Sequence, residues 1–237
     1  MSAASQTAVK EPALIDSARS YESPHAYYKT LREKGAVAIT DIGVFVVLKH
    51  DYMDMLLDNA NTRQFEMEGM MLRGIASGPL YDFYRDSMLF ANGDVHKRRR
   101  APMVRTFAYK LMDGVRPRVR EIAGEVIAAH RGGGEVNFLD DFSRAIPARI
   151  IAEIIGAPAE DWPKFSKWVA DSARGIGFFS KDELPEIEAG VKALNDYVAG
   201  LLADRRRAPR EDFLSSYAQA PAAAGDLDEN EIRCQMA

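Results

Sequence analysis

Apolar residues recur at helical spacing along most of this chain of 237 residues. Positions three and four apart share one face of a helix, so this spacing predicts amphipathic helices that bury one side. Glycine and proline residues near the ends of several segments support their boundaries. The ranges predicted to be helical are 24–34, 52–59 with Asp51 as its cap, 115–130, 144–155, 161–173, 184–207 and 211–217.

Extended structure is predicted at few places. Residues 36–40 and 44–48 are rich in β-branched side chains and flank Asp41-Ile42-Gly43, a combination typical of a hairpin. Residues 135–139 are a further strand candidate. The predicted fold class is therefore mainly α with a small β element.

One long segment, residues 61–90, has no steady period and contains several glycines and methionines. We predict a long loop there, which is either flexible core filling or an adaptable apolar binding surface. Residues 1–20 are predicted to form a flexible leader, because the chain begins with small and polar residues. Residues 21–237 are predicted to form a single domain.

The candidate site lies in the stretch GDVHKRRRAPMVRTF, residues 93–107. Asp94 is a suitable N-cap, and in a helix His96 and Arg100 are four apart and share a face. That face continues through Met103, Val104 and Phe107, with Arg98 and Arg105 on the other side. Because an apolar stripe faces the interior, we expect the two basic residues to be carried inward. A buried guanidinium then requires an anionic partner, either a carboxylate of this chain or a bound anion.

Pro102 leaves an alternative open. In a helix interior it removes a hydrogen bond at a cost of about 3 kcal/mol, so the helix can instead begin near Ala101, with the basic run in a loop. A basic helix with a solvated face and an ordinary histidine is the simpler interpretation of the same residues.

Composition limits the function classes. The net charge is −4, so the basic run is a local patch and a nucleic-acid-binding role is disfavoured. The single cysteine, Cys234, excludes an internal disulfide and predicts a cytoplasmic location. No apolar run reaches the length of a membrane span, so no membrane association is expected.

A helix start signal lies close to the last residue. Asp228 and Glu231 have the spacing of a capping box, and Ile232 and Met236 begin an apolar stripe. The chain ends at Ala237, about two turns later. We expect from this that the sequence is cut short.

The order of these elements resembles the N-terminal half of a soluble, bacterial-type cytochrome P-450, a haem-thiolate monooxygenase. The resemblance covers most of the chain and rests on YYKTLREKGAV, VFVVLKHDYMDMLLDN, GDVHKRRRAPMVRTF and PREDFLSSY. It implies that His96 and Arg100 bind the haem propionates. It also implies that Arg98 and Arg105 lie on the side where an electron-donor protein of the ferredoxin or flavodoxin type docks.

The resemblance does not extend to the family's catalytic parts. The acid–alcohol pair, the Glu-x-x-Arg motif and the glycine-rich loop with the iron-ligating cysteine are absent from this sequence. We therefore predict no catalytic residue and no metal ligand in this chain, and Cys234 is not expected to replace the missing ligand. Haem is expected in the complete protein and weakly or not at all in this chain.

The leading hypothesis is thus a portion of an iron- and haem-binding oxidoreductase that inserts oxygen into a small apolar organic substrate and is inactive alone. Residues 61–90 and Phe178–Phe179 resemble family regions that line the substrate pocket. The alternative is a non-catalytic helical binding protein in which His96, Arg100 and the basic run hold an anionic ligand.

Overall fold

A computed structural model describes residues 11–106, 109–177, 179–224 and 227–237. The chain divides into two compact units, Met1–Arg63 and Gln64–Ala237. In the described part of the chain, no helix is both long enough and apolar enough to cross a lipid bilayer.

The first unit is a small sheet with helices. Strand β2 (Val37–Ile39) pairs in parallel with β1 (Ala13–Leu14) and antiparallel with β3 (Phe45–Val47). Its helical segments are α1 (Ser17–Glu22), α2 (Pro24–Lys34), the 3₁₀ turn η1 (His50–Tyr52) and α3 (Met53–Leu57). The predicted hairpin and the helix that starts at Pro24 are confirmed.

The core of this unit consists of four buried residues: Ile15, Tyr27, Leu31 and Ala38. Residues 11–20 contain β1 and the start of α1, so ordered structure begins earlier than the leader prediction placed it, and residues 1–10 lie outside the described residues. The Tyr27 hydroxyl oxygen accepts a hydrogen bond of 2.7 Å from the Asp16 amide. This bond ties the residue that caps α1 to the buried face of α2.

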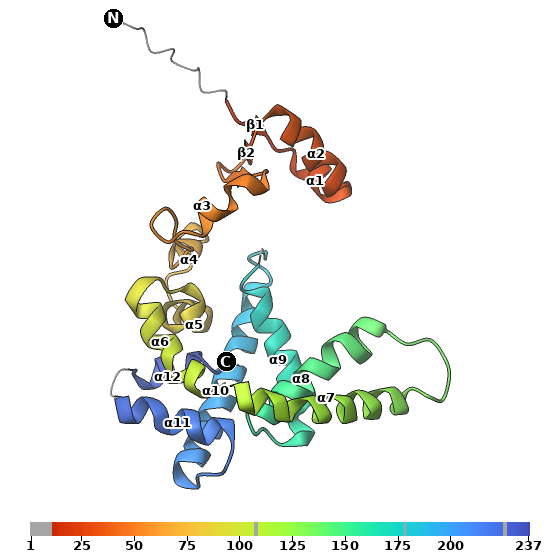
Figure 1. Ribbon diagram of the computed structural model, residues 1–237, viewed down its shortest axis with the longest axis vertical. Coiled ribbons are helices and arrows are strands. Elements are labelled where there is room, and N and C mark those ends of the chain that lie inside the picture. Colours follow the sequence, from red (N-terminus) through yellow and green to blue (C-terminus); the bar gives the residue numbers. More distant parts are fainter. Residues whose placement is uncertain (1–10, 107–108, 178, 225–226) are drawn as a thin grey trace, which may run out of the picture. The chain divides into compact units, whose positions relative to one another are not determined.

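The second unit is helical (Figure 1). Its α-helices are α4 (Glu68–Leu72), α5 (Pro79–Asp86), α6 (Gly93–Thr106), α7 (Tyr109–Ala129), α8 (Ala145–Ile154), α9 (Trp162–Arg174), α10 (Leu184–Arg207), α11 (Phe213–Ala224) and α12 (Glu229–Cys234). Shorter segments are the 3₁₀ turns η2 (Met88–Phe90) and η4 (Ala159–Asp161) and the π-helical segment η3 (Leu139–Arg144).

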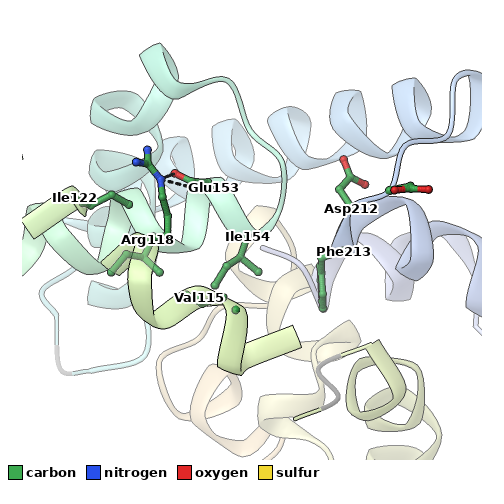
Figure 2. Close-up of a pocket in the computed structure, with 10 residues that line it drawn as sticks. Val115, Arg118, Ile122, Glu153, Ile154, Asp212 and Phe213 are labelled. Atoms are coloured by element: carbon green, nitrogen blue, oxygen red, sulfur yellow. Dashed lines mark hydrogen bonds and ion pairs between the residues drawn. The ribbon is translucent and has the colours of Figure 1, made fainter. Parts of the chain in front are cut away.

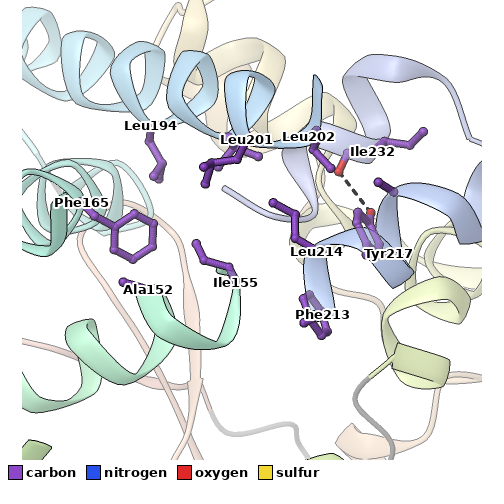
Figure 3. Packing of buried hydrophobic residues seen from close by; sticks show 12 residues of the cluster. Ala152, Ile155, Phe165, Leu194, Leu201, Leu202, Phe213, Leu214, Tyr217 and Ile232 are labelled. Atoms are coloured by element: carbon purple, nitrogen blue, oxygen red, sulfur yellow. Dashed lines mark hydrogen bonds between the residues drawn. The ribbon is translucent and has the colours of Figure 1, made fainter. Parts of the chain in front are cut away.

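Helix α10 organises the larger core of this unit. Its apolar positions repeat at helical spacing, and Leu194, Val198 and Leu202 are each 1% exposed or less. Figure 3 shows Leu194, Leu201 and Leu202 facing residues from α8, α9, α11 and α12. The buried Tyr217 hydroxyl donates a hydrogen bond of 3.1 Å to the Ile232 carbonyl, which fastens α12 to α11.

A second core lies where α4 and α5 meet α10. Met70, Leu80 and Ile187 are all fully buried there. The Tyr84 hydroxyl donates a hydrogen bond of 2.9 Å to the Gly175 carbonyl, just after α9. A Cβ atom at Gly175 would lie 2.6 Å from a Leu80 methyl carbon, so a larger residue there would require this buried side chain to shift.

Two sequence predictions are wrong in this unit. Residues 61–90 were expected to form a loop, but they contain α4, α5 and η2, because short amphipathic turns there pack against α10. Residues 135–139 were expected to form a strand, but no strand is assigned there and η3 begins at Leu139. The acidic side chains of η3 accept local hydrogen bonds from Asn137, which supports a helical turn rather than an extended segment.

The packing around α10 makes a stability prediction. Leu202→Ala is expected to lower the free energy of unfolding by about 2–5 kcal/mol, because it leaves a cavity at a site with no exposed surface. Urea unfolding measures this loss. Leu72→Ala, at a side chain that is 81% exposed, is the matched control and should change stability by less than about 0.5 kcal/mol. Equal losses in both variants would contradict this description of the core.

Candidate functional site

Helix α6 carries the candidate site as one continuous helix from Gly93 to Thr106. Pro102 lies inside it, so the alternative in which the helix begins near Ala101 is wrong. Gly93 has a φ of 57°, which suits glycine at this helix start. Asp94 therefore lies in the first turn rather than at the N-cap, and its carboxylate pairs with Lys97 at 3.1 Å.

Among the cations of α6 whose side chains the structure describes, Arg99 is the most buried, with 7% of it exposed. Its guanidinium donates to the carbonyls of Arg85 and Ser87 at 2.9 and 3.1 Å. Its Nε also donates to the Glu231 carboxylate at 2.9 Å. Both carbonyls lie where α5 passes into η2, so Arg99 joins α6 to these elements and to α12.

Glu231 is an internal anion, but it pairs with Arg98 and Arg99 and not with Arg100, for which the sequence predicted one. Arg98 binds both of its carboxylate oxygens, at 2.8 and 2.5 Å. The Glu231 side chain is only 7% exposed. Burial raises the pKa of this carboxyl, but hydrogen bonds from Arg98, Arg99 and the Asp228 amide outweigh burial and lower the pKa to about 2.

Local structure positions this carboxylate. Asp228 caps α12 and accepts from the Glu231 amide at 2.8 Å, while Glu231 accepts in return from the Asp228 amide at 3.2 Å. The predicted capping box is confirmed. One turn later, the Gln235 amide group accepts from the Met88 amide at 2.7 Å and donates to the Asp86 carbonyl at 2.8 Å. These bonds add further links between α12 and the α5–η2 junction.

The predicted orientation of α6 is wrong. His96 is half-buried, Arg100 is exposed and Val104 is 57% exposed, whereas Arg99 and Pro102 are buried. Of the predicted inward stripe, Met103 packs against the main core, and Phe107 lies outside the described residues. Arg98, predicted to point outward, binds Glu231. The side of α6 with Pro102 faces the interior because Glu231 compensates the cations Arg98 and Arg99 on that side.

His96 and Arg100 remain together on the other side of α6. In the described part of the chain, neither side chain makes an ion pair or a hydrogen bond. An imidazole and a guanidinium one turn apart are suited to bind a carboxylate or phosphate group. The residues that sequence reasoning missed are Arg99 and Glu231. Arg99 could have been found from its spacing, because it lies three and four residues before Pro102 and Met103 and so shares a helix face with them. Glu231 was interpreted only as part of the capping box, although a carboxylate can also pair with a buried cation.

A cavity of about 260 Å³ lies elsewhere, between α7, α8 and the start of α11 (Figure 2). Its walls include Val115, Ile154 and Phe213. Three charged residues of its lining are already paired: Arg118 binds Glu153 at 2.7 Å, and Asp212 binds the buried Arg205 at 2.6 Å. None of the predicted site residues lines this cavity.

Comparison with known proteins identifies the family, although no protein-family model matches the chain. The chain is 33% identical over 227 residues to plant-inducible cytochrome P450-pinF1 of Rhizobium radiobacter. It is 26% identical over 216 residues to a putative cytochrome P450 133B2 of Xylella fastidiosa. The fold agrees with this: the crystal structure of CalO2 matches 94% of the chain with a TM-score of 0.81 at 21% identity.

The chain belongs to the cytochrome P450 family. The match includes 95% of this chain but 54% of P450-pinF1, so the chain spans about half the length of the curated relatives that it matches. The structure of P450BioI with an acyl carrier protein shows the same proportions, with 93% of this chain and 57% of that chain aligned at a TM-score of 0.78.

The residues of this P450 chain fit one part of a haem site. The exposed face with His96 and Arg100 suits the carboxylates of haem propionates. The iron ligand is a separate question, because haem iron in this family takes a single cysteine thiolate and Cys234 is the one cysteine of the sequence. Cys234 is 4% exposed, and its thiol lies 4.0 Å from the Asn195 side-chain oxygen. Burial raises the pKa of this thiol to about 11, so it is protonated at neutral pH.

The low pKa of Glu231 predicts an acid-sensitive contact. An acid with a lowered pKa in the folded state stabilises the fold above its unfolded pKa and loses this contribution as the pH falls toward the folded value. With a shift from 4.5 to about 2, we expect roughly 2 kcal/mol of this stabilisation to be lost between about pH 6 and 3. Urea unfolding at both pH values should show this loss in the native protein and not in Glu231→Gln. The same pH dependence in both proteins would contradict the assignment.

The burial of the Cys234 thiol leads to a prediction for the absorption spectrum of a haem complex. Mixed with ferrous haem and carbon monoxide, this chain is expected not to show the red-shifted Soret band of thiolate ligation, because the Cys234 thiol is buried and protonated. An absorption difference spectrum tests this. A thiolate-type band that disappears in Cys234→Ser would show that the assignment of Cys234 is wrong.

Proposed function

We propose that the complete protein is a haem-dependent monooxygenase that inserts one oxygen atom of dioxygen into an apolar organic substrate. The observation that carries the proposal is the match to a P450 over 95% of this chain. Other relatives are named as enzymes of this kind, such as the mycinamicin IV hydroxylase/epoxidase of Micromonospora griseorubida, which is 27% identical over 154 residues.

In this proposal, His96 and Arg100 hold the haem propionates. Both side chains lie on one face of α6, and in the described part of the chain no carboxylate neutralises them. The neighbouring Arg98 and Arg99 are already bound to Glu231, so they do not compete for the same anion. When bound with a thiolate ligand, haem supplies the activation of dioxygen.

The proposed partners are an apolar substrate and an electron-donor protein of the ferredoxin or flavodoxin type, in a cytoplasmic setting. Apolar side chains of α4 support the substrate class, since Met71 and Leu72 are 69% and 81% exposed. Among the structural neighbours, P450BioI is described in complex with an acyl carrier protein that carries hexadec-9Z-enoic acid. That ligand is also apolar along its chain. Of the predicted Phe178–Phe179 pair, Phe178 lies outside the described residues, and Phe179 packs with the second core.

The haem role predicts a loss of cofactor retention. In the complete protein encoded by the reading frame of this chain, His96→Ala and Arg100→Ala should each raise the haem dissociation constant roughly ten-fold or more. Each removes a contact to a charged group, worth about 1.5–3 kcal/mol. Haem titration followed at the Soret band measures the change.

Lys97→Ala is the matched control, because Lys97 lies in the same helix with a side chain that is 77% exposed and pairs with Asp94. Its haem affinity should not change. Equal loss in all three variants would contradict the assignment of the haem-facing side. If haem does not bind and inorganic phosphate protects the chain only when both His96 and Arg100 are present, the non-catalytic anion-binding protein is the correct alternative.

A further inference from the structure

We propose that Glu231 is a positioning residue for the haem-facing side of α6. It acts through Arg98 and Arg99 and sets the rotation of the helix that presents His96 and Arg100 together. This inference rests on the proposed haem role of those two residues.

The cations of α6 lie on two sides of the helix, and the two sides have different surroundings. Successive residues of a helix are about 100° apart, so Arg98, Arg99 and Pro102 occupy one side, and His96, Arg100 and Val104 occupy roughly the other. The first side is held by contacts inside the protein. The second side makes no ion pair among the described residues. A rotation that moved one set would necessarily move the other.

The internal side is anchored at several points. Three hydrogen bonds from Arg98 and Arg99 converge on one carboxylate, and two more reach the carbonyls of Arg85 and Ser87. A guanidinium is planar and rigid, so these bonds fix the angle of Arg99 as well as its distance. Anchors of this kind resist rotation of α6 about its own axis better than apolar packing alone.

The anchor depends on the negative charge of Glu231. The nearby Asp86 is already bound to Arg85 at 2.7 Å, and Asp228 caps α12. In the described part of the chain, Glu231 is the carboxylate that Arg99 binds, so this cation loses its anionic partner when the charge of Glu231 is removed. A buried cation without a partner moves toward water, because desolvation of an unpaired charge is costly. Arg99 is 7% exposed, so we expect it to reach solvent through a shift of its side chain together with α6.

Retention of a haem depends on this rotation, because two cations must meet two propionates at once. Contacts of this kind lose strength when the donors move by about an ångström. Loss of the Glu231 charge should therefore weaken haem retention through His96 and Arg100, although Glu231 lies on the other side of the helix from them.

A double-mutant cycle in the complete haem-loaded protein tests this. The measured quantity is the rate at which haem transfers to an excess of apomyoglobin. Glu231→Gln is expected to increase this rate about ten-fold in the native background and about two-fold or less in an Arg100→Ala background, because the cation that Glu231 positions is then missing. Glu229→Gln is the matched control, since Glu229 lies in the same helix with a 62% exposed side chain. Its haem transfer rate should equal that of the native protein.

The outcomes separate the two proposals. Equal acceleration by Glu231→Gln in both backgrounds indicates general destabilisation and overturns the positioning role. An unchanged rate in Glu231→Gln, with Arg100→Ala strongly affected, overturns the positioning role alone. If Arg100→Ala and His96→Ala have no effect, the haem role fails first. Should Glu231→Gln not fold, the same cycle is run with Arg99→Lys, which keeps the charge and loses the rigid fork, and the same results decide.

Discussion

One buried carboxylate connects α12 with α6 in the second unit. Glu231 lies on α12, near the last described residue, and compensates Arg98 and Arg99, which lie more than 130 residues earlier on α6. Charges taken out of water destabilise a fold unless each is paired and its remaining donors and acceptors are bonded. Here the capping box and two backbone carbonyls complete that bonding.

This pairing distinguishes the two sides of α6. The side with Arg99 is bonded within the chain, which leaves His96 and Arg100 to face outward. The apolar core around α10 supports the arrangement, since Tyr217 and Ile232 hold α12 against α11. Packing and electrostatics therefore act on the same short helix, and α12 could not bring Glu231 to α6 without its buried apolar face.

Membership of the cytochrome P450 family relates this geometry to a role in haem binding, which is the role proposed above. The chain matches cytochrome P450s along nearly all of its length and spans about half of theirs. His96 and Arg100 lie one turn apart on α6 and make no ion pair among the described residues. The protonated, buried Cys234 is a packing residue in this structure. The proposed propionate binding rests on these two cations.

Local patterns determined most of the helices. The prediction over 184–207 agrees with α10 at both ends, because its buried positions repeat at helical spacing and Pro185 lies in its first turn. The hairpin and the capping box at Asp228 were also predicted, since turn and cap chemistry act over a few residues. The order of these elements was enough to identify the P450 resemblance.

Tertiary contacts decided what the sequence left open or predicted wrongly. The helices within residues 61–90 are too short to show a helical repeat in the sequence. Packing against α10 stabilises α4 and α5 instead. Which side of α6 is buried also depended on a residue that is distant in the sequence. His96–Arg100 and Arg99–Pro102 are both plausible inward faces by spacing, and a buried cation is stable only where an anion meets it. Glu231 supplies that anion from the far end of the chain, and only the folded structure brings the two together.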